Sequence, residues 1–210
     1  MNIVKKLNAS VRANVRFALF VVFAVVTLAA PLSIIWKYES ALHYGTQFKF
    51  RTQPVDPVDA FRGRYVTLSF KDDWAGKLKN VGPMEADFLY VRLKCDADGF
   101  AVPGFVSLNR LSGDDVITAT NARRRLYGDK WEWHFDYPFD RYYLPEDVAP
   151  MAEQLYREAN IRGGASSRDG DSAKADTYVT VRVRNGVGVI EELYLNGVPV
   201  REAVRAQMRK

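Results

Sequence analysis

Few side chains in this sequence are of types that carry out acid–base or nucleophilic chemistry. The 210 residues include two histidines and one cysteine. His134 stands in a run of alternating aromatic and polar residues, where strand geometry places it on one face with Asp136. A histidine–carboxylate pair can exchange protons, but catalysis needs a third group and a cleft. Since the sequence shows neither, we expect His134 on a solvated strand face. His43 stands beside Tyr44, a few residues after the apolar segment described below, and we expect it in an aromatic cluster near the membrane.

Other catalytic and metal-binding patterns are missing from the sequence. The motifs HExxH, GxxxxGKS/T and GxSxG do not occur. Cys95 is followed by Asp96, and a nearby carboxylate disfavours the thiolate that a catalytic cysteine needs. Ser40 has the place of the nucleophile in a signal-peptidase-like Ser/Lys enzyme, but no particular lysine is indicated as its partner. The sequence therefore predicts no catalytic residue, no metal ligand and no cofactor.

Carboxylates, a glycine and arginines gather in one short segment before an expected strand. The segment reads Pro54-Val-Asp-Pro-Val-Asp-Ala-Phe-Arg-Gly-Arg-Tyr-Val-Thr-Leu-Ser-Phe70. Its aspartates can accept hydrogen bonds from neighbouring backbone N–H groups, and its glycine is free to take a positive φ where the chain turns into the strand. The segment forms either a corner of the fold or a small polar binding site. The residues concerned are Asp56, Asp59, Arg62, Gly63, Arg64, Tyr65 and Leu68.

This segment resembles the signature of the GDYxxLxY family of bacterial membrane-anchored proteins, with GRYVTLSF at residues 63–70. The family has aspartate where Arg64 stands and tyrosine where Phe70 stands, so one departure reverses a charge and the other removes a hydroxyl. The runs Asp140–Glu146 and Leu193–Val200 are similar to later segments of the family. The matching signature positions are Asp56, Pro57, Asp59, Phe61, Arg62, Gly63, Tyr65 and Leu68. The resemblance implies a membrane-anchored protein for which no activity is established.

An apolar segment near the N-terminus predicts a membrane anchor. Phe17 to Trp36 contains 20 residues without a formal charge, and a helix of this length covers about 30 Å, the thickness of a hydrocarbon core. The segment is preceded by four basic residues and no acid, which places residues 1–16 in the cytoplasm. We expect a single-pass protein of the bacterial inner membrane, with residues 40–210 forming a periplasmic domain. A signal peptide cleaved after Ala30 and a buried core helix are the alternatives.

Most of the net positive charge of the chain lies in residues 1–36. The protein has 30 basic and 25 acidic residues, a net charge of +5. Residues 1–36 hold four of the basic residues, which leaves 26 basic and 25 acidic residues in the remainder, a net charge of +1. A nearly neutral domain gives no electrostatic argument for nucleic acid as a partner.

Beyond the anchor, alternation of apolar and polar residues predicts strands. Asn185-Gly186 between two alternating runs predicts a hairpin with a type I′ turn. Pro103-Gly104 predicts either that its strand lies at an edge or that it is divided into two short strands. The strands are expected over 46–51, 65–70, 87–94, 100–108, 131–137, 177–183 and 187–195.

The segment 148–159 has helical rather than strand periodicity, with apolar residues on one face. We expect this helix to end at Gly163-Gly164. We expect Arg123, Arg124 and Arg125 in a solvated loop, with contact to acidic lipid headgroups or to a partner as the alternative. The fold class is therefore mostly β: an antiparallel β domain with one amphipathic α-helix, preceded by a single N-terminal transmembrane helix.

These observations favour an accessory or scaffold protein over an enzyme. Its expected partners are the lipid bilayer, through Phe17 to Trp36, and another membrane or envelope protein that the β domain contacts. The alternative is a membrane-tethered hydrolase that uses the carboxylates near residues 56–64. The missing pair of nucleophile and base argues against this alternative.

Overall fold

The computed structural model describes residues 2–53, 65–70, 73–76, 84–127, 130–165 and 177–209. The chain divides into two compact units, Met1–Glu39 and Ser40–Lys210. The first unit consists of most of one long helix, and the second contains all the strands. We describe each unit by itself.

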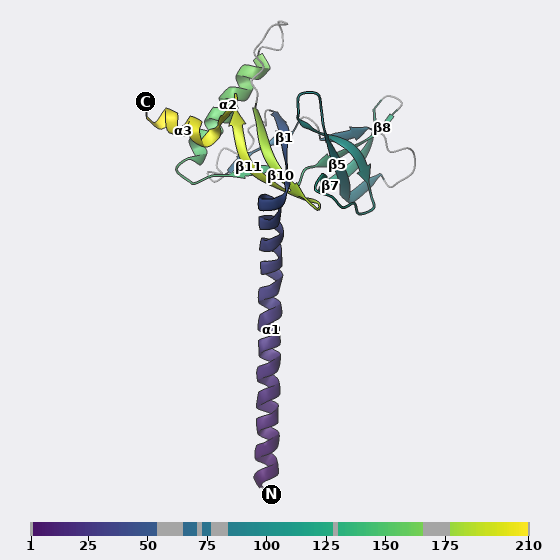
Figure 1. Ribbon diagram of the computed structural model, residues 1–210, viewed down its shortest axis with the longest axis vertical. Coiled ribbons are helices and arrows are strands. Elements are labelled where there is room, and N and C mark those ends of the chain that lie inside the picture. Colours follow the sequence, from purple (N-terminus) through teal and green to yellow (C-terminus); the bar gives the residue numbers. More distant parts are fainter. Residues whose placement is uncertain are drawn as a thin grey trace. The chain divides into compact units, whose positions relative to one another are not determined.

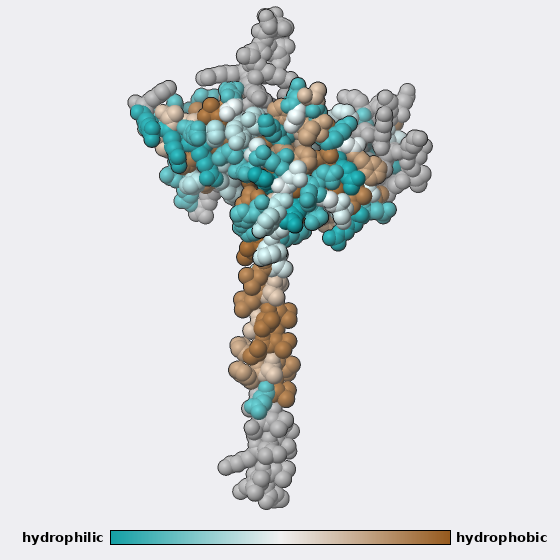
Figure 2. Space-filling model, in the orientation of Figure 1, coloured by the Kyte–Doolittle hydropathy of each residue, from teal (hydrophilic) through white to brown (hydrophobic). Residues whose placement is uncertain are grey.

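The N-terminal helix α1 (Asn2–Tyr44) includes the apolar segment predicted from the sequence. Its stretch Asn14–Tyr44 is long and apolar enough to cross a membrane, with a mean hydropathy of 2.6 in an 18-residue window, although a signal sequence passes the same test. The large apolar side chains of this stretch are exposed, such as Phe17 at 68% and Ile35 at 57%, and the hydrophobic colour of the helix is plain in Figure 2. A continuous apolar surface of this kind is unfavourable in water and indicates contact with lipid or with another protein.

The second unit is built from antiparallel sheets, which confirms the predicted fold class (Figure 1). A first five-stranded sheet has the order β12-β11-β10-β1-β3. Its strands are β1 (Thr46–Gln53), β3 (Ser69–Phe70), β10 (Thr177–Arg184), β11 (Val187–Leu195) and β12 (Val198–Pro199). Strands β10 and β11 form the predicted hairpin, with φ of 47° at Asn185 and 89° at Gly186.

A second five-stranded sheet has the order β4-β8-β7-β5-β6, and a short ribbon pairs β2 with β9. The expected edge position of the Pro103-Gly104 strand is confirmed, since β6 ends this sheet. The strands of the second sheet are β4 (Trp74–Gly76), β5 (Glu85–Cys95), β6 (Ala101–Ser107), β7 (Val116–Tyr127) and β8 (Lys130–Asp136). The ribbon consists of β2 (Tyr65–Thr67) and β9 (Arg141–Tyr143).

One hydrophobic core contains buried residues of both sheets and of the segments 149–159 and 200–204, because the apolar residues of the alternating strands face inward. Phe50 of β1, 1% exposed, is central to it. Its ring centroid lies 5.1 Å from that of Phe139, 5.2 Å from that of Tyr137 and 6.0 Å from that of Phe70, all in edge-to-face orientation. Such aromatic pairs stabilise by about 0.5–1.5 kcal/mol beyond the burial of their area.

The turn of the β10–β11 hairpin joins the two sheets. Gly186 forms a parallel bridge with Ile117 of β7. Its carbonyl accepts a hydrogen bond from the N–H of Thr118 (2.9 Å), and its own N–H donates to the carbonyl of Val116 (2.9 Å). The turn of one sheet is therefore held by the backbone of the other.

Two helices follow in the second unit, α2 (Ala149–Ala165) and α3 (Val200–Met208). Both contact β11, on the side away from β5, β7 and β8 (Figure 1). Helix α3 is not among the elements predicted from the sequence; its Val200 and Val204 are fully buried one helical turn apart. The expected end of α2 at Gly163-Gly164 is wrong, because the helix continues to Ala165; a glycine inside a helix costs about 1 kcal/mol and does not by itself stop it.

The last turn of α1, from Ser40 onward, belongs to the second unit and is tied to β10. Arg184 donates from Nη1 to Oγ (3.0 Å) and the carbonyl (3.4 Å) of Ser40. The N–H of Gly45 donates to the carbonyl of Ala41 (2.8 Å), and Arg182 donates to the carbonyl of Gly45 (3.3 Å). These donors satisfy carbonyls that a helix leaves unpaired at its C-terminal end.

Candidate functional site

Five of the seven motif residues lie outside the described residues: Asp56, Asp59, Arg62, Gly63 and Arg64. Their roles as a fold corner or a binding site, and the carboxylates of the hydrolase alternative, stay predictions. The structure describes the other two, Tyr65 and Leu68, and places them differently.

Strand β2, which carries the motif tyrosine, pairs with β9. Tyr65 stands opposite Tyr143 and Thr67 opposite Arg141, and the N–H of Leu68 continues the pairing with a 2.8 Å hydrogen bond to the carbonyl of Asp140. The described part of the first segment, residues 65–68, and residues 140–143 of the second therefore meet in one ribbon.

The ring of Tyr65 lies in a small exposed cluster on this ribbon. Its centroid is 5.6 Å from that of Tyr143 in edge-to-face orientation, and the guanidinium carbon of Arg141 lies 5.1 Å from it. Tyr143 is 63% exposed. We call Tyr65, Arg141 and Tyr143 the ribbon cluster. Tyrosine and arginine are enriched where proteins contact one another.

Leu68 and Phe70 instead face the core. They are 4% and 6% exposed, and the ring of Phe70 packs edge-to-face against Tyr137 at 5.2 Å and Phe139 at 5.5 Å. A tyrosine at position 70 would bring a hydroxyl to this apolar surrounding, at a cost unless it found a hydrogen-bond partner. For these two motif positions the structural role is therefore the better supported one.

Tyr142, on the other face of β9, ties α3 to the sheet. Its hydroxyl donates to Oε1 of Glu192 (2.6 Å) and accepts a hydrogen bond from Nε of Arg201 (3.1 Å). Burial, followed by the hydrogen bond to Glu192, raises the pKa of Tyr142 above its ordinary value. The hydroxyl thus stays protonated and remains a donor, which suits a structural role.

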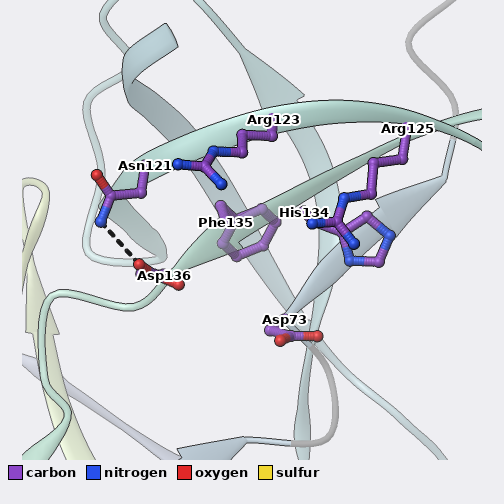
Figure 3. Close-up of a pocket in the computed structure, with 7 residues that line it drawn as sticks. All are labelled: Asp73, Asn121, Arg123, Arg125, His134, Phe135 and Asp136. Atoms are coloured by element: carbon purple, nitrogen blue, oxygen red, sulfur yellow. Dashed lines mark hydrogen bonds between the residues drawn. The ribbon is translucent and has the colours of Figure 1, made fainter. Parts of the chain in front are cut away.

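A polar cleft of about 340 Å³ lies on the outer face of the second sheet (Figure 3). It provides the cleft beside His134 that the sequence did not show. Strand β8 contributes His134, Phe135 and Asp136, and Asp73 precedes β4. The lining residues are Asp73, Asn121, Arg123, Arg125, His134, Phe135 and Asp136. We call this the β7–β8 cleft.

A β-bulge in β7 turns its arginines toward this cleft. Asn121 has φ of 50°, and the register between β7 and β8 shifts between Thr120 and Arg123. Before the bulge the odd-numbered Ile117 and Ala119 are buried, and after it the even-numbered Ala122 is buried. Strict alternation would have sent the side chains of residues 123 and 125 into the core.

Arg123 and Arg125 are therefore exposed residues of a strand. The expectation of a loop over Arg123–Arg125 is wrong, because a bulge reverses the facing of the chain without interrupting the strand. Strands are predicted from alternating apolar and polar residues, and three consecutive arginines do not show this alternation.

The β7–β8 cleft is lined by charged and hydrogen-bonding side chains. Asn121 donates from Nδ2 to Oδ2 of Asp136 (2.8 Å), and His134 stands opposite Arg123 in the strand register. None of the described lining residues is a serine, threonine or cysteine, and the described residues hold no group of three side chains that could bind a metal ion.

The other residues considered as nucleophiles or acid–base groups, Cys95, Ser40 and His43, do not line this cleft. Cys95 is an exposed free thiol at the end of β5, and the hydroxyl of Ser40 accepts its hydrogen bond from Arg184. His43 lies next to Tyr44, with ring centroids 6.4 Å apart.

Comparison with protein families identifies the chain. The family model described as GDYXXLXY protein matches residues 27–193, a range that includes the apolar segment from Thr27 onward, the ribbon cluster and the β7–β8 cleft. No curated protein and no solved structure matches the chain significantly. The match covers most of the 210 residues, and the chain therefore belongs to the GDYXXLXY protein family.

Proposed function

We propose that this protein is a single-pass membrane-anchored accessory protein whose β domain docks on another membrane or envelope component. The observation that carries the anchoring is the stretch Asn14–Tyr44 of α1, of whose most apolar window no part is buried within the protein. A bilayer provides the apolar environment that these side chains need.

The distribution of charge supports one orientation. Lys5, Lys6, Arg12 and Arg16 precede the apolar segment, and no acid occurs before residue 39. Basic residues stay on the cytoplasmic side of a span. The charge distribution supports a periplasmic position of the β domain in a bacterial cell.

The ribbon cluster supports the docking role. Tyr65 and Tyr143 offer rigid rings at a small entropic cost, and Arg141 adds a charge that can bind carboxylates. Tyr65 belongs to the segment that resembles the family signature, and Arg141 and Tyr143 lie on β9, the strand that pairs with it. We therefore assign the partner contact to this cluster.

The orientation makes a direct prediction for reporter fusions. A reporter that is active only outside the cytoplasm should be active when it is fused after Lys210 and inactive when it is fused after Arg16. An alkaline wash of the membranes should leave the full-length chain in the pellet, because a spanning helix resists extraction. An active fusion at Arg16 with a silent one at Lys210 would reverse the orientation, and a shortened soluble product would indicate cleavage.

The docking role predicts a site-dependent crosslink in cells. A photoreactive amino acid in place of Tyr143 should give a discrete crosslinked band of a membrane or envelope protein, because this side chain is 63% exposed in the ribbon cluster. The same amino acid in place of Arg110, an exposed residue between β6 and β7, serves as the matched control. Equal band patterns at both positions, or none at Tyr143, would contradict the assignment.

A further inference from the structure

We propose that Arg184 and Tyr44 bind the phosphate group of a membrane lipid beside the end of α1. The inference rests on the proposed anchoring and deepens it, since it names the chemistry with which the β domain contacts the membrane surface. Both residues belong to the second unit, Ser40–Lys210. They lie outside the ribbon cluster and the β7–β8 cleft, so the inference depends on neither of these sites.

The covalent chain keeps this site near the bilayer surface. The apolar segment ends at Trp36, and Ser40 follows four residues later. Four residues span at most about 14 Å even when fully extended, and the headgroup layer outside the hydrocarbon core is about 5–7 Å thick. Arg184 donates to the hydroxyl (3.0 Å) and to the carbonyl (3.4 Å) of Ser40. Its guanidinium is therefore held within reach of lipid headgroups in the anchored protein.

Arg184 has a charge that the β domain leaves uncompensated. Arg182, two residues earlier on β10, forms an ion pair with Glu191 at 3.2 Å. Within the described part of the second unit Arg184 forms no ion pair. The C-terminal end of α1 offers only a partial charge of about −0.5, which is half of what the guanidinium carries. An anion that binds Arg184 would neutralise the rest.

The hydrogen-bond donors of Arg184 are only partly used. Within the described residues its side chain donates through Nη1 alone, which leaves Nε and Nη2 for a ligand. These two nitrogens form one edge of the guanidinium, and such an edge can bind two oxygens of a phosphate side by side. The guanidinium carbon lies 5.4 Å from the ring centroid of Tyr44, a contact that restricts its orientation.

Tyr44 adds a hydroxyl and an exposed ring to the site. Its side chain is 74% exposed. Among the described residues its hydroxyl has no hydrogen-bond partner, so it can donate to a phosphate oxygen. Tyrosine is enriched at membrane interfaces, where its ring contacts apolar groups and its hydroxyl stays in a polar layer. A lipid therefore suits this site better than free phosphate, since its apolar part can cover the ring.

Native mass spectrometry of the full-length protein in a nonionic maltoside detergent tests the inference. The probe is a short-chain phosphatidylglycerol, and the fraction of protein that carries one lipid gives its apparent affinity. We expect Arg184→Gln to weaken the affinity about ten-fold, since hydrogen bonds to charged groups contribute on this order. Arg110→Gln, at an exposed arginine between β6 and β7, is the matched control and should not change it. Equal affinity in Arg184→Gln and the unmodified protein, or no binding at millimolar lipid, would overturn the proposal.

Two further variants separate lipid binding from the role of Arg184 at the helix end. Ser40→Ala removes the hydroxyl that accepts from Nη1, so it should lower the melting temperature but leave the lipid affinity unchanged. Tyr44→Phe keeps the ring and removes the hydroxyl, and it should weaken lipid binding about five-fold. A loss of affinity in Ser40→Ala as large as in Arg184→Gln would indicate a disturbed helix end instead of a lipid site. Unchanged affinity in Tyr44→Phe would also contradict the proposal.

Other probes identify the source of the phosphate group. Inorganic phosphate that displaces the lipid at equal concentration would overturn the assignment to a lipid. Phosphatidylethanolamine should bind less tightly than phosphatidylglycerol, because its amine is repelled by the guanidinium; tighter binding of phosphatidylethanolamine would count against charge compensation at Arg184.

The alkaline wash described above keeps this inference distinguishable from the proposed function. A chain that stays in the pellet, with unchanged lipid affinity in Arg184→Gln, would contradict the lipid site alone. A chain found in the soluble fraction would contradict the anchoring itself.

Discussion

Replacing Phe50 by alanine is expected to lower the free energy of unfolding of the β domain by about 3–5 kcal/mol, the usual cost of deleting a fully buried aromatic ring. Phe50 is 1% exposed and contacts three other rings that belong to β3 and to the segment after β8. The loss should be measured by urea denaturation of the full-length protein in detergent. The intrinsic fluorescence of Trp133, 1% exposed, reports the unfolding of the core.

Phe105 offers the matched control, because it is a phenylalanine of a strand with 53% of its surface exposed. Phe105→Ala should change the free energy of unfolding by less than about 0.5 kcal/mol. If Phe50→Ala lowered the free energy of unfolding as little as this control, the result would contradict the packing of Phe50 against the other three rings.

Replacing Gly45 by valine is expected to destabilise the domain by about 3 kcal/mol, the upper part of the range for over-packing. A Cβ atom at this position would overlap the carbonyl oxygen of Ala41 and lie 2.9 Å from that of Val183. Both are backbone atoms, so neither can swing aside as the end of a side chain can. The last turn of α1 and β10 would have to separate, which would break the 2.8 Å hydrogen bond between Gly45 and Ala41.

Thr46→Val, at the next residue, provides the control for Gly45→Val. Thr46 is exposed at the start of β1 and already carries a branched Cβ, so this change should shift the free energy of unfolding by less than about 0.5 kcal/mol. The same urea titration measures both variants. Equal, small effects would mean that the junction between α1 and β1 is looser than the structure indicates.

The strands could be predicted because alternation of apolar and polar residues is a property of each strand's own sequence. Over most of β1 and β10, and over Leu89–Leu93 of β5, buried residues alternate with exposed or half-buried ones. This period is visible in the sequence without knowledge of the partner strand. The Asn185-Gly186 turn was predictable for the same reason, since positive φ at both residues is a property of those residue types.

The elements that were not predicted depend on partners that are distant in the sequence. Helix α3 has only Val200 and Val204 on its buried face, too few for a pattern of helical period. The register shift at the bulge occurs in the pairing of β7 with β8, and only this pairing shows which way Arg123 faces.

The β7–β8 cleft could not be predicted for a related reason. The sequence pointed to His134 and Asp136 as a pair on one face, which the structure agrees with. Their companions come from β7 and from Asp73, and the pairing of β4 with β8, Trp74 opposite His134, brings the latter close. Sheet order, which no local pattern encodes, decides this neighbourhood.

The single core shared by the two sheets also bears on how long the protein survives. Local opening of one sheet would expose the inner face of the other, and the bridge between Gly186 and Ile117 would have to break as well. Openings that expose cleavable backbone in these strands therefore have free energies close to that of global unfolding. Degradation by proteases should then depend on the rare, fully unfolded state of the domain, so that its turnover is set by overall stability rather than by the fraying of single strands.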